Sequence, residues 1–223
     1  MIKNKKLVIF GTGELAELSH FYFTNDSEYE VVAFCLDEEF INSKIHLNLP
    51  IVNYKEIEKI YPIENYELFI AIGYSKLNEN RREKYLDSKL KGYKLASYIS
   101  SKSSYWPSLV IGDNTFIMES NTIMPFCKIG NNVLIWVNND IAHHMVIEDH
   151  VTITSHCAIG GNVIIKEQSF IGLNSTIRNN IVIGKCSIIG AATNVTRDIK
   201  DFSLVMGNPA KSREIDPRKI NLL

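Results

Sequence analysis

An aliphatic residue recurs at every sixth position through the second half of the chain. Between residues 111 and 195 this position holds isoleucine fourteen times and then valine once. The positions are Ile111, Ile117, Ile123, Ile129, Ile135, Ile141, Ile147, Ile153, Ile159, Ile165, Ile171, Ile177, Ile183, Ile189 and Val195. A period of six fits neither the 3.6-residue period of a helix nor the alternation of a simple strand.

Such a repeat predicts a solenoid over residues 99–205. Three hexapeptides would form one triangular coil, and successive coils would stack at the strand spacing of about 4.8 Å. The aliphatic residues would then form continuous inward rows. Glycine often follows the aliphatic residue, and we expect it to serve tight corners with positive φ. An ordinary β-sandwich is disfavoured, because irregular hairpin loops would break a strict period.

The first part of the chain alternates apolar runs of strand length with segments of helical pattern. Strands are predicted over 6–10, 30–36, 49–52, 68–73 and 94–99, and helices over 14–23, 54–61 and 78–90. This order predicts a small Rossmann-like α/β domain over residues 1–98. Gly11, Asp37 and Gly73 would then lie at strand ends along one edge of the sheet, where open α/β sheets bind ligands.

The turn after the first strand carries Gly11-x-Gly13-x-x-Ala16, with Asp37 about twenty residues further on. Glycines there let backbone N–H groups and a helix N-terminus approach a phosphate. Two alternatives remain at this stage, a purely structural turn and an NAD site. Glu14 would repel a phosphate at this place.

After Val195 the period fails. Val205–Lys211 is predicted to be an irregular loop that leaves the solenoid, and residues 206–223 to form a C-terminal loop or cap whose last twelve residues are weakly ordered.

Composition limits the class of protein. The net charge of −1 argues against a general nucleic-acid binder. No apolar run has the length of a membrane span, and the opening ten residues are too short and strand-like for a signal peptide. The four cysteines show no CxxC spacing, and Cys127, Cys157 and Cys186 fall at interior positions of the repeat. We therefore expect buried free thiols in a reducing cytoplasm and no zinc site.

Four of the six histidines lie between residues 143 and 156. Residues eighteen apart stack in a three-sided solenoid, which places His143 over Gly161. An imidazole there can accept a proton near neutral pH, and the Gly161 N–H can bind a carbonyl oxygen, as acyl transfer requires. The alternatives are solvated, idle histidines, chiefly His150 and His156, and a metal site without the expected carboxylate or thiolate partners.

These features resemble the hexapeptide-repeat acyltransferases, and most closely the sugar O- and N-acetyltransferases that include the sialic acid O-acetyltransferases and the bacillosamine N-acetyltransferase. The resemblance spans nearly the whole chain and is carried by the repeat, by the segments 141–144 and 160–163, and by the closing Gly207–Lys211. It implies a left-handed parallel β-helix and a homotrimer that binds acetyl-CoA between neighbouring solenoids.

The resemblance also implies the site residues. His143 would be the general base, and the Gly161 N–H would contact the thioester carbonyl. Thr152, Leu173 and Ala191 would line the CoA groove. Gly13, Glu14, Asp37, Glu38 and Gly73 would hold the nucleotide of a nucleotide-linked sugar.

The chain departs from the family pattern at two places. The bacillosamine enzyme type has glutamate directly after the catalytic histidine, where this chain has His144, so Asp140 and Asn162 are the candidates to orient His143. Glu14-Leu15 replaces the glycine-histidine turn of the amino-sugar enzymes.

The sequence thus predicts a cytoplasmic acetyl-CoA-dependent transferase without a metal, which acetylates a nucleotide-linked amino sugar for a bacterial surface glycan. O-acetylation of a sialic acid or polysaccharide sugar is the alternative within this class. A non-catalytic trimeric scaffold and an NAD-binding protein are the alternatives outside it.

Overall fold

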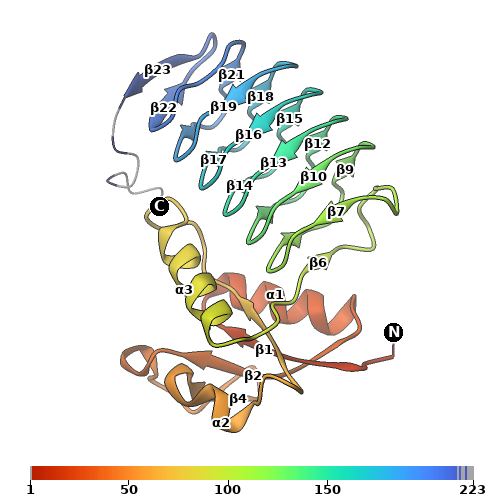
Figure 1. Cartoon of the computed structure of the whole chain (residues 1–223), viewed down its shortest axis with the longest axis vertical. Helices are drawn as coiled ribbons and strands as arrows, with labels where there is room; N and C mark the ends of the chain where they lie inside the picture. Colours follow the sequence, from red (N-terminus) through yellow and green to blue (C-terminus); the bar gives the residue numbers. More distant parts are fainter. Residues whose placement is uncertain (1, 215, 217–218, 220–223) are drawn as a thin grey trace. The chain divides into compact units, whose positions relative to one another are not determined.

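The structure is a computed structural model that describes residues 2–214, 216 and 219 (Figure 1). It divides into two compact units. One comprises the chain up to Gly73 together with Arg81–Tyr98, and the other comprises Tyr74–Asn80 and the chain from Ile99 onward. The short segment Tyr74–Asn80 therefore packs with the solenoid, although its sequence pattern belongs to the α/β part.

The first unit is built on a sheet with the order β3-β4-β2-β1-β5. Strands β4, β2, β1 and β5 are parallel to one another, and β3 is antiparallel to β4. The strands are β1 (Lys5–Phe10), β2 (Tyr29–Leu36), β3 (Ile45–His46), β4 (Leu49–Asn53) and β5 (Glu67–Ile70). The helices are α1 (Glu14–Asn25), η1 (Glu38–Phe40), η2 (Tyr54–Glu56), α2 (Ile57–Ile60) and α3 (Glu79–Leu90), of which α3 belongs to this unit from Arg81 onward.

Both faces of this sheet are covered. Phe23 of α1 packs edge-on against Phe69 of β5, while Val8 and Phe10 of β1 join a second cluster with Tyr54. Such two-sided burial explains why these strands read as continuous apolar runs.

Three predictions for this unit need correction. β5 ends at Ile70 and not at Gly73, and the helix predicted over 54–61 is a 3₁₀ turn followed by one turn of α-helix. The strand predicted over 94–99 is reduced to a single bridge, Leu68 to Leu95, and the short strand β6 (Tyr98–Ile99). Short runs with little periodicity carry too little signal to fix such boundaries.

The second unit is a parallel β-helix of two-residue strands, which confirms the predicted solenoid. Face I has the strands β7 (Val110–Ile111), β10 (Lys128–Ile129), β13 (Val146–Ile147), β16 (Ile164–Ile165) and β19 (Val182–Ile183). Face II has β8 (Phe116–Ile117), β11 (Leu134–Ile135), β14 (Thr152–Ile153), β17 (Phe170–Ile171) and β20 (Ile188–Ile189). Face III has β9 (Thr122–Ile123), β12 (Asp140–Ile141), β15 (Ala158–Ile159), β18 (Thr176–Ile177) and β21 (Asn194–Val195).

Each strand pairs in parallel with the strand eighteen residues away, so that Ile135, for example, lies between Ile117 and Ile153. Figure 1 shows the coils stacked along the axis of the solenoid. The repeated aliphatic residues from Ile117 to Val195 are at most 3% exposed and form the core. The six-residue period in the sequence therefore results from this inward packing.

The corners are made differently from the prediction. Fourteen residues spaced six apart, from Asn114 to Ala192, adopt a positive φ near +50° to +70°, and six are asparagine and three histidine. These residue types tolerate the left-handed region better than most. The glycines that follow the aliphatic residues do not have positive φ; a Cβ on Gly112 would instead collide with the backbone and side chain of Asn131. Glycine here permits close approach of two coils.

The predicted loop over Val205–Lys211 is reduced to a turn at residues 207–210. β22 (Ser203–Met206) continues face II, and β23 (Lys211–Glu214) pairs with it as an antiparallel hairpin. Most of the twelve residues predicted to be a weakly ordered cap lie outside the described residues.

All four cysteines are buried and none forms a disulfide, as predicted for the three in the repeat. Burial raises the pKa of the Cys157 thiol. Among the residues that the structure describes, no helix has the length and apolar character needed to cross a membrane. Nor do the described side chains include three or more His, Cys, Asp or Glu residues arranged to hold a metal ion.

Candidate active site

His143 lies directly against Gly161, as the eighteen-residue register predicts. Both residues are on the edge where face III turns into face I, one coil apart, and the N–H of Asn162 donates to the carbonyl oxygen of His143 (3.0 Å). A Cβ placed on Gly161 would lie 2.6 Å from Cε1 and 2.8 Å from Nε2 of His143. The imidazole therefore occupies the space that any side chain at position 161 would need.

The backbone N–H of Gly161 donates to no acceptor among the residues that the structure describes, whereas the neighbouring N–H groups of Gly160 and Asn162 are both bonded. Gly161 is itself buried under the half-buried imidazole, so its N–H is a buried donor that still needs an acceptor. A potential base and a potential oxyanion donor side by side are the two groups that acyl transfer needs.

The backbone explains the other three clustered histidines. His144, His150 and His156 all occupy the left-handed corner position, with φ of 58°, 64° and 63°. His150 is buried, with Nδ1 2.9 Å from Nδ2 of Asn132, so the expectation that it is solvated is wrong. His143 has no such conformational reason to be histidine.

His144 contacts His143 directly. The two Nδ1 atoms are 3.0 Å apart, and the ring planes are nearly perpendicular at 86°. The sequence suggested Asp140 or Asn162 as the residue that orients His143. Among the described contacts, neither side chain bonds to the His143 ring, whereas the ring of His144 does.

Phe126 supports His144 from the neighbouring coil. The two rings have centroids 4.6 Å apart and an interplanar angle of 37°, and Phe126 is 70% exposed. The sequence reading missed Phe126, although it lies eighteen residues before His144. The same register that joined His143 to Gly161 could have identified it.

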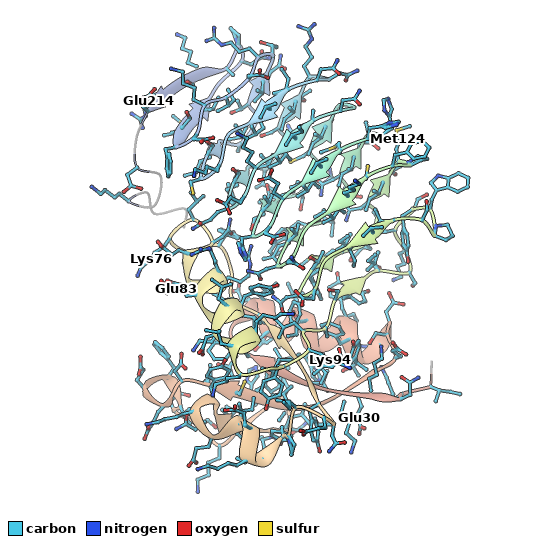
Figure 2. The ribbon with its side chains drawn as sticks, viewed as in Figure 1. Glu30, Lys76, Glu83, Lys94, Met124 and Glu214 are labelled. Atoms are coloured by element: carbon cyan, nitrogen blue, oxygen red, sulfur yellow. The ribbon has the colours of Figure 1, made fainter. Side chains whose placement is uncertain are left out.

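A groove of about 600 Å³ runs along face III beside this edge. Its lining residues near the edge are Met124 (Figure 2), Ala142, Gly160, Arg178 and Asn179. Small side chains leave the floor of the groove open, and Arg178 is the positively charged residue among those that line it. It forms no ion pair or side-chain hydrogen bond within the described part of the chain.

The three other residues expected to contact CoA lie elsewhere. Leu173 (53% exposed) and Ala191 are one coil apart on the edge between faces II and III, on the far side of face III from His143. Thr152 is on face II and fully buried, and its hydroxyl donates to Oδ1 of Asn78 (2.7 Å). The covering segment Tyr74–Asn80 removes Thr152 from any ligand groove, and that expectation is corrected.

The residues expected to hold a nucleotide are in the first unit, at the carboxyl ends of its strands. Gly13 precedes α1, whose N-terminus has no side-chain cap within the described chain, and Glu14 is the first residue of α1. Asp37 and Glu38 follow β2, and Asp37 accepts a hydrogen bond from Lys84 Nζ (2.8 Å). Gly73 follows β5, and its carbonyl accepts one from the buried Arg81 (2.9 Å).

Comparison with known proteins places this geometry in context. The bacterial transferase hexapeptide family (six repeats) matches residues 108–139. No match is found among curated protein sequences. The fold is shared with the acetyltransferase domain of PglB from Neisseria gonorrhoeae, which is 24% identical over 94% of this chain and 100% of that one, with a TM-score of 0.84.

Two further structures carry ligands. The same PglB domain in complex with acetyl coenzyme A gives a TM-score of 0.83 at 21% identity, over 94% of this chain and 100% of that one. A variant of perosamine N-acetyltransferase from Caulobacter crescentus, in complex with CoA and GDP-perosamine, gives 0.72 at 22% identity, over 93% and 96%. This chain therefore carries the hexapeptide repeat of the bacterial transferases and has the fold of these acetyltransferases.

Proposed function

We propose that this chain is an acetyl-CoA-dependent acetyltransferase that acts on a sugar, in the first place on the amine of a nucleotide-linked amino sugar for a bacterial surface glycan. One observation carries the proposal. The His143 ring packs on Gly161, whose N–H has no partner within the described chain, beside an open groove. The ligands of the similar structures, acetyl-CoA in one and CoA with GDP-perosamine in another, support the choice of substrates.

In this mechanism Nε2 of His143 removes a proton from the acceptor amine as the nitrogen attacks the thioester carbon. The Gly161 N–H stabilises the negative charge that develops on the carbonyl oxygen. When the tetrahedral intermediate collapses, the C–S bond breaks and the CoA thiolate takes the proton from His143. The acyl group passes directly to the acceptor, so no covalent enzyme intermediate forms.

The groove on face III is proposed to hold the donor. Arg178 lies two coils from Ala142, about 10 Å along the solenoid at the strand spacing. Its free guanidinium suits the phosphates of CoA, which lie beyond the pantetheine arm. Leu173 and Ala191 would contribute from the other edge of face III. In a homotrimer, that edge of a neighbouring chain could complete the groove.

Arg178→Gln is expected to raise the KM for acetyl-CoA by about 10- to 100-fold, because a hydrogen bond to a charged group contributes about 1.5–3 kcal/mol. The kcat should stay within about twofold, since Arg178 is remote from the reacting carbonyl. S-acetylpantetheine, which lacks the phosphates, should show no difference between Arg178→Gln and the parent protein. Lys59→Gln, on the exposed surface of α2 in the first unit, is the matched control. An unchanged KM for acetyl-CoA would remove Arg178 from the donor site.

The first unit is proposed to be a Rossmann-like domain that binds the nucleotide. The parallel order β4-β2-β1-β5 corresponds to strands 3-2-1-4 of the dinucleotide fold, whose ligands bind at the carboxyl ends of the strands. Gly13 and Gly73 offer backbone at that edge. The carboxylates of Glu14, Asp37 and Glu38 suit the hydroxyl and N–H donors of a nucleoside better than its phosphates.

We also propose a left-handed coil, a homotrimer and a cytoplasmic location. The outward residues of face I are mostly aliphatic and partly exposed, including Val110, Val146, Ile164 and Val182. An apolar stripe of this kind is typical of a surface covered in an assembly. Four cysteines without a disulfide are typical of a reducing compartment.

The test is a thiol-release assay with acetyl-CoA against UDP-, dTDP- and GDP-linked 4-amino sugars, with free sialic acid included. Turnover on an amino sugar, with mass spectrometry showing one added acetyl group, is the expected result. Turnover on sialic acid alone would change the acceptor to a hydroxyl and leave the mechanism intact. Absence of both turnover and CoA binding by calorimetry would favour the non-catalytic scaffold.

A further inference from the structure

The contact between His143 and His144 restricts where their protons can be. Their Nδ1 atoms are 3.0 Å apart, and two imidazole nitrogens at that distance require one hydrogen between them. No acidic side chain of the described residues forms an ion pair with either ring. The pair is thus a hydrogen bond between two imidazoles, and which ring donates determines the tautomer of each neutral ring.

Only one of the two arrangements leaves His143 able to act as a base. If His143 donates from Nδ1, its Nε2 carries a bare lone pair on the side of Gly161. If His144 donates, Nε2 of a neutral His143 carries the hydrogen and cannot accept a proton. The role of His143 in acyl transfer therefore depends on His144 as an acceptor.

His144 is itself held in place. Its backbone lies in the left-handed region, with φ of 58°, and its ring packs on Phe126 with a centroid distance of 4.6 Å. A chain of contacts therefore runs from Phe126 through His144 and His143 to Gly161. Each link joins adjacent residues or neighbouring coils, so the ring of His143 contacts both His144 and Gly161.

We propose that His144 is a positioning residue of the acyl transfer, whose Nδ1 accepts a hydrogen bond from Nδ1–H of His143 and so fixes the tautomer that leaves Nε2 as the base. The inference rests on the proposed function of His143. When Nε2 takes the proton of the acceptor, the imidazolium still donates from Nδ1 to a neutral His144, and this bond becomes charge-assisted. The thiolate later receives the proton from Nε2, and His144 returns unchanged.

The chain itself supplies matched replacements for His144. Phe126, Asn162 and Asn180 stack in the same row and adopt φ of 69°, 57° and 59°. Phenylalanine and asparagine are therefore compatible with the backbone at position 144. His144→Phe retains a ring that can pack on Phe126 but has no nitrogen. His144→Asn places an amide oxygen as many bonds from Cα as Nδ1, so it can accept the same hydrogen bond without titrating.

Steady-state kinetics on the full chain test the role. His144→Phe is expected to lower kcat by about 10- to 100-fold, a typical effect of displacing a catalytic group, while the KM for acetyl-CoA stays within about twofold. His144→Asn should retain kcat within about threefold. Thermal melting of both variants should match that of the parent protein. Parent-like kcat in His144→Phe, or an equal loss in both variants, would overturn the proposal.

The tautomer can be measured without any substrate. In ¹⁵N-labelled parent protein and His144→Asn, long-range imidazole spectra should show His143 protonated at Nδ1 and bare at Nε2. His144→Phe should lose this preference. Finding the hydrogen on Nε2 of His143 in the parent protein would contradict the proposal even if the enzyme is active. The expected tautomer without turnover on any sugar would instead contradict the proposed function and leave the pairing intact.

Discussion

Replacing His143 with alanine is expected to lower kcat for acetyl transfer by at least about 10²-fold, the usual lower bound for loss of a general base. The calorimetric Kd for CoA should change by less than about twofold, because Arg178 and the floor of the groove remain. Initial rates of thiol release, with the acceptor that the panel identifies, provide the measurement. The expected combination is therefore intact donor binding without chemistry.

His156→Asn is the matched control for this experiment. His156 is exposed on a different edge of the solenoid, and Asn138 and Asn174 stack in its row with φ of 60° and 59°. Its replacement should leave kcat, KM and melting temperature unchanged. Near-parental activity in His143→Ala would exclude this residue as the base. A loss shared by both variants would indicate a general disturbance of the solenoid.

The solenoid could be predicted from the sequence because its contacts are periodic. Each coil of eighteen residues places position i against i+18, so one rule fixes the core, the register and the neighbours of every corner residue. The stack of His143 on Gly161 follows from that rule alone. In the first unit, apolar runs and glycine breaks locate β1, α1 and β2 closely, because strands buried on both faces carry strong local signals.

The wrong prediction for Thr152 arises because a contact outside the repeat determines its burial. The segment Tyr74–Asn80 covers part of face II. Tyr74 packs on Phe170 there, and the side-chain oxygen of Asn78 accepts a hydrogen bond from the hydroxyl of Thr152. Nothing in the repeat identifies that partner. A signal was present, since the outward residues of face II include Phe116 and Leu134, whereas those of face III are small or polar.

The choice of corner residue shows a second kind of limit. The repeat locates every corner, but it does not say which residue of a corner takes positive φ. The structure assigns it to the third residue after the aliphatic, and the adjacent glycines are required by the close approach of coils. The hydrogen bond between His143 and His144 could not be predicted from the sequence either. It depends on two side-chain rotamers, one of which is held by Phe126.

Gly161→Ala is the sharpest test of the site, because it adds a single methyl group where the base must lie. The new Cβ would be 2.6 Å from Cε1 of His143, so the ring must move. The ring has two rotatable bonds and sits on a half-exposed corner, so we expect it to swing away at a cost below about 1 kcal/mol in the free energy of unfolding. The kcat should still fall by about 10²-fold, since a displacement of about 1 Å is enough for such a loss.

Gly190→Ala is the control, because its Cβ would meet Cγ of Met206, a flexible and exposed side chain remote from His143. The double variant His143→Ala with Gly161→Ala provides the decisive comparison. If Gly161→Ala acts by displacing the ring, the double variant should be no slower than His143→Ala alone, because residues that act as a unit are not additive. A further tenfold loss in the double variant would show that the methyl group blocks the ligand itself. An unchanged rate in Gly161→Ala would mean that the chemistry takes place away from this edge of the solenoid.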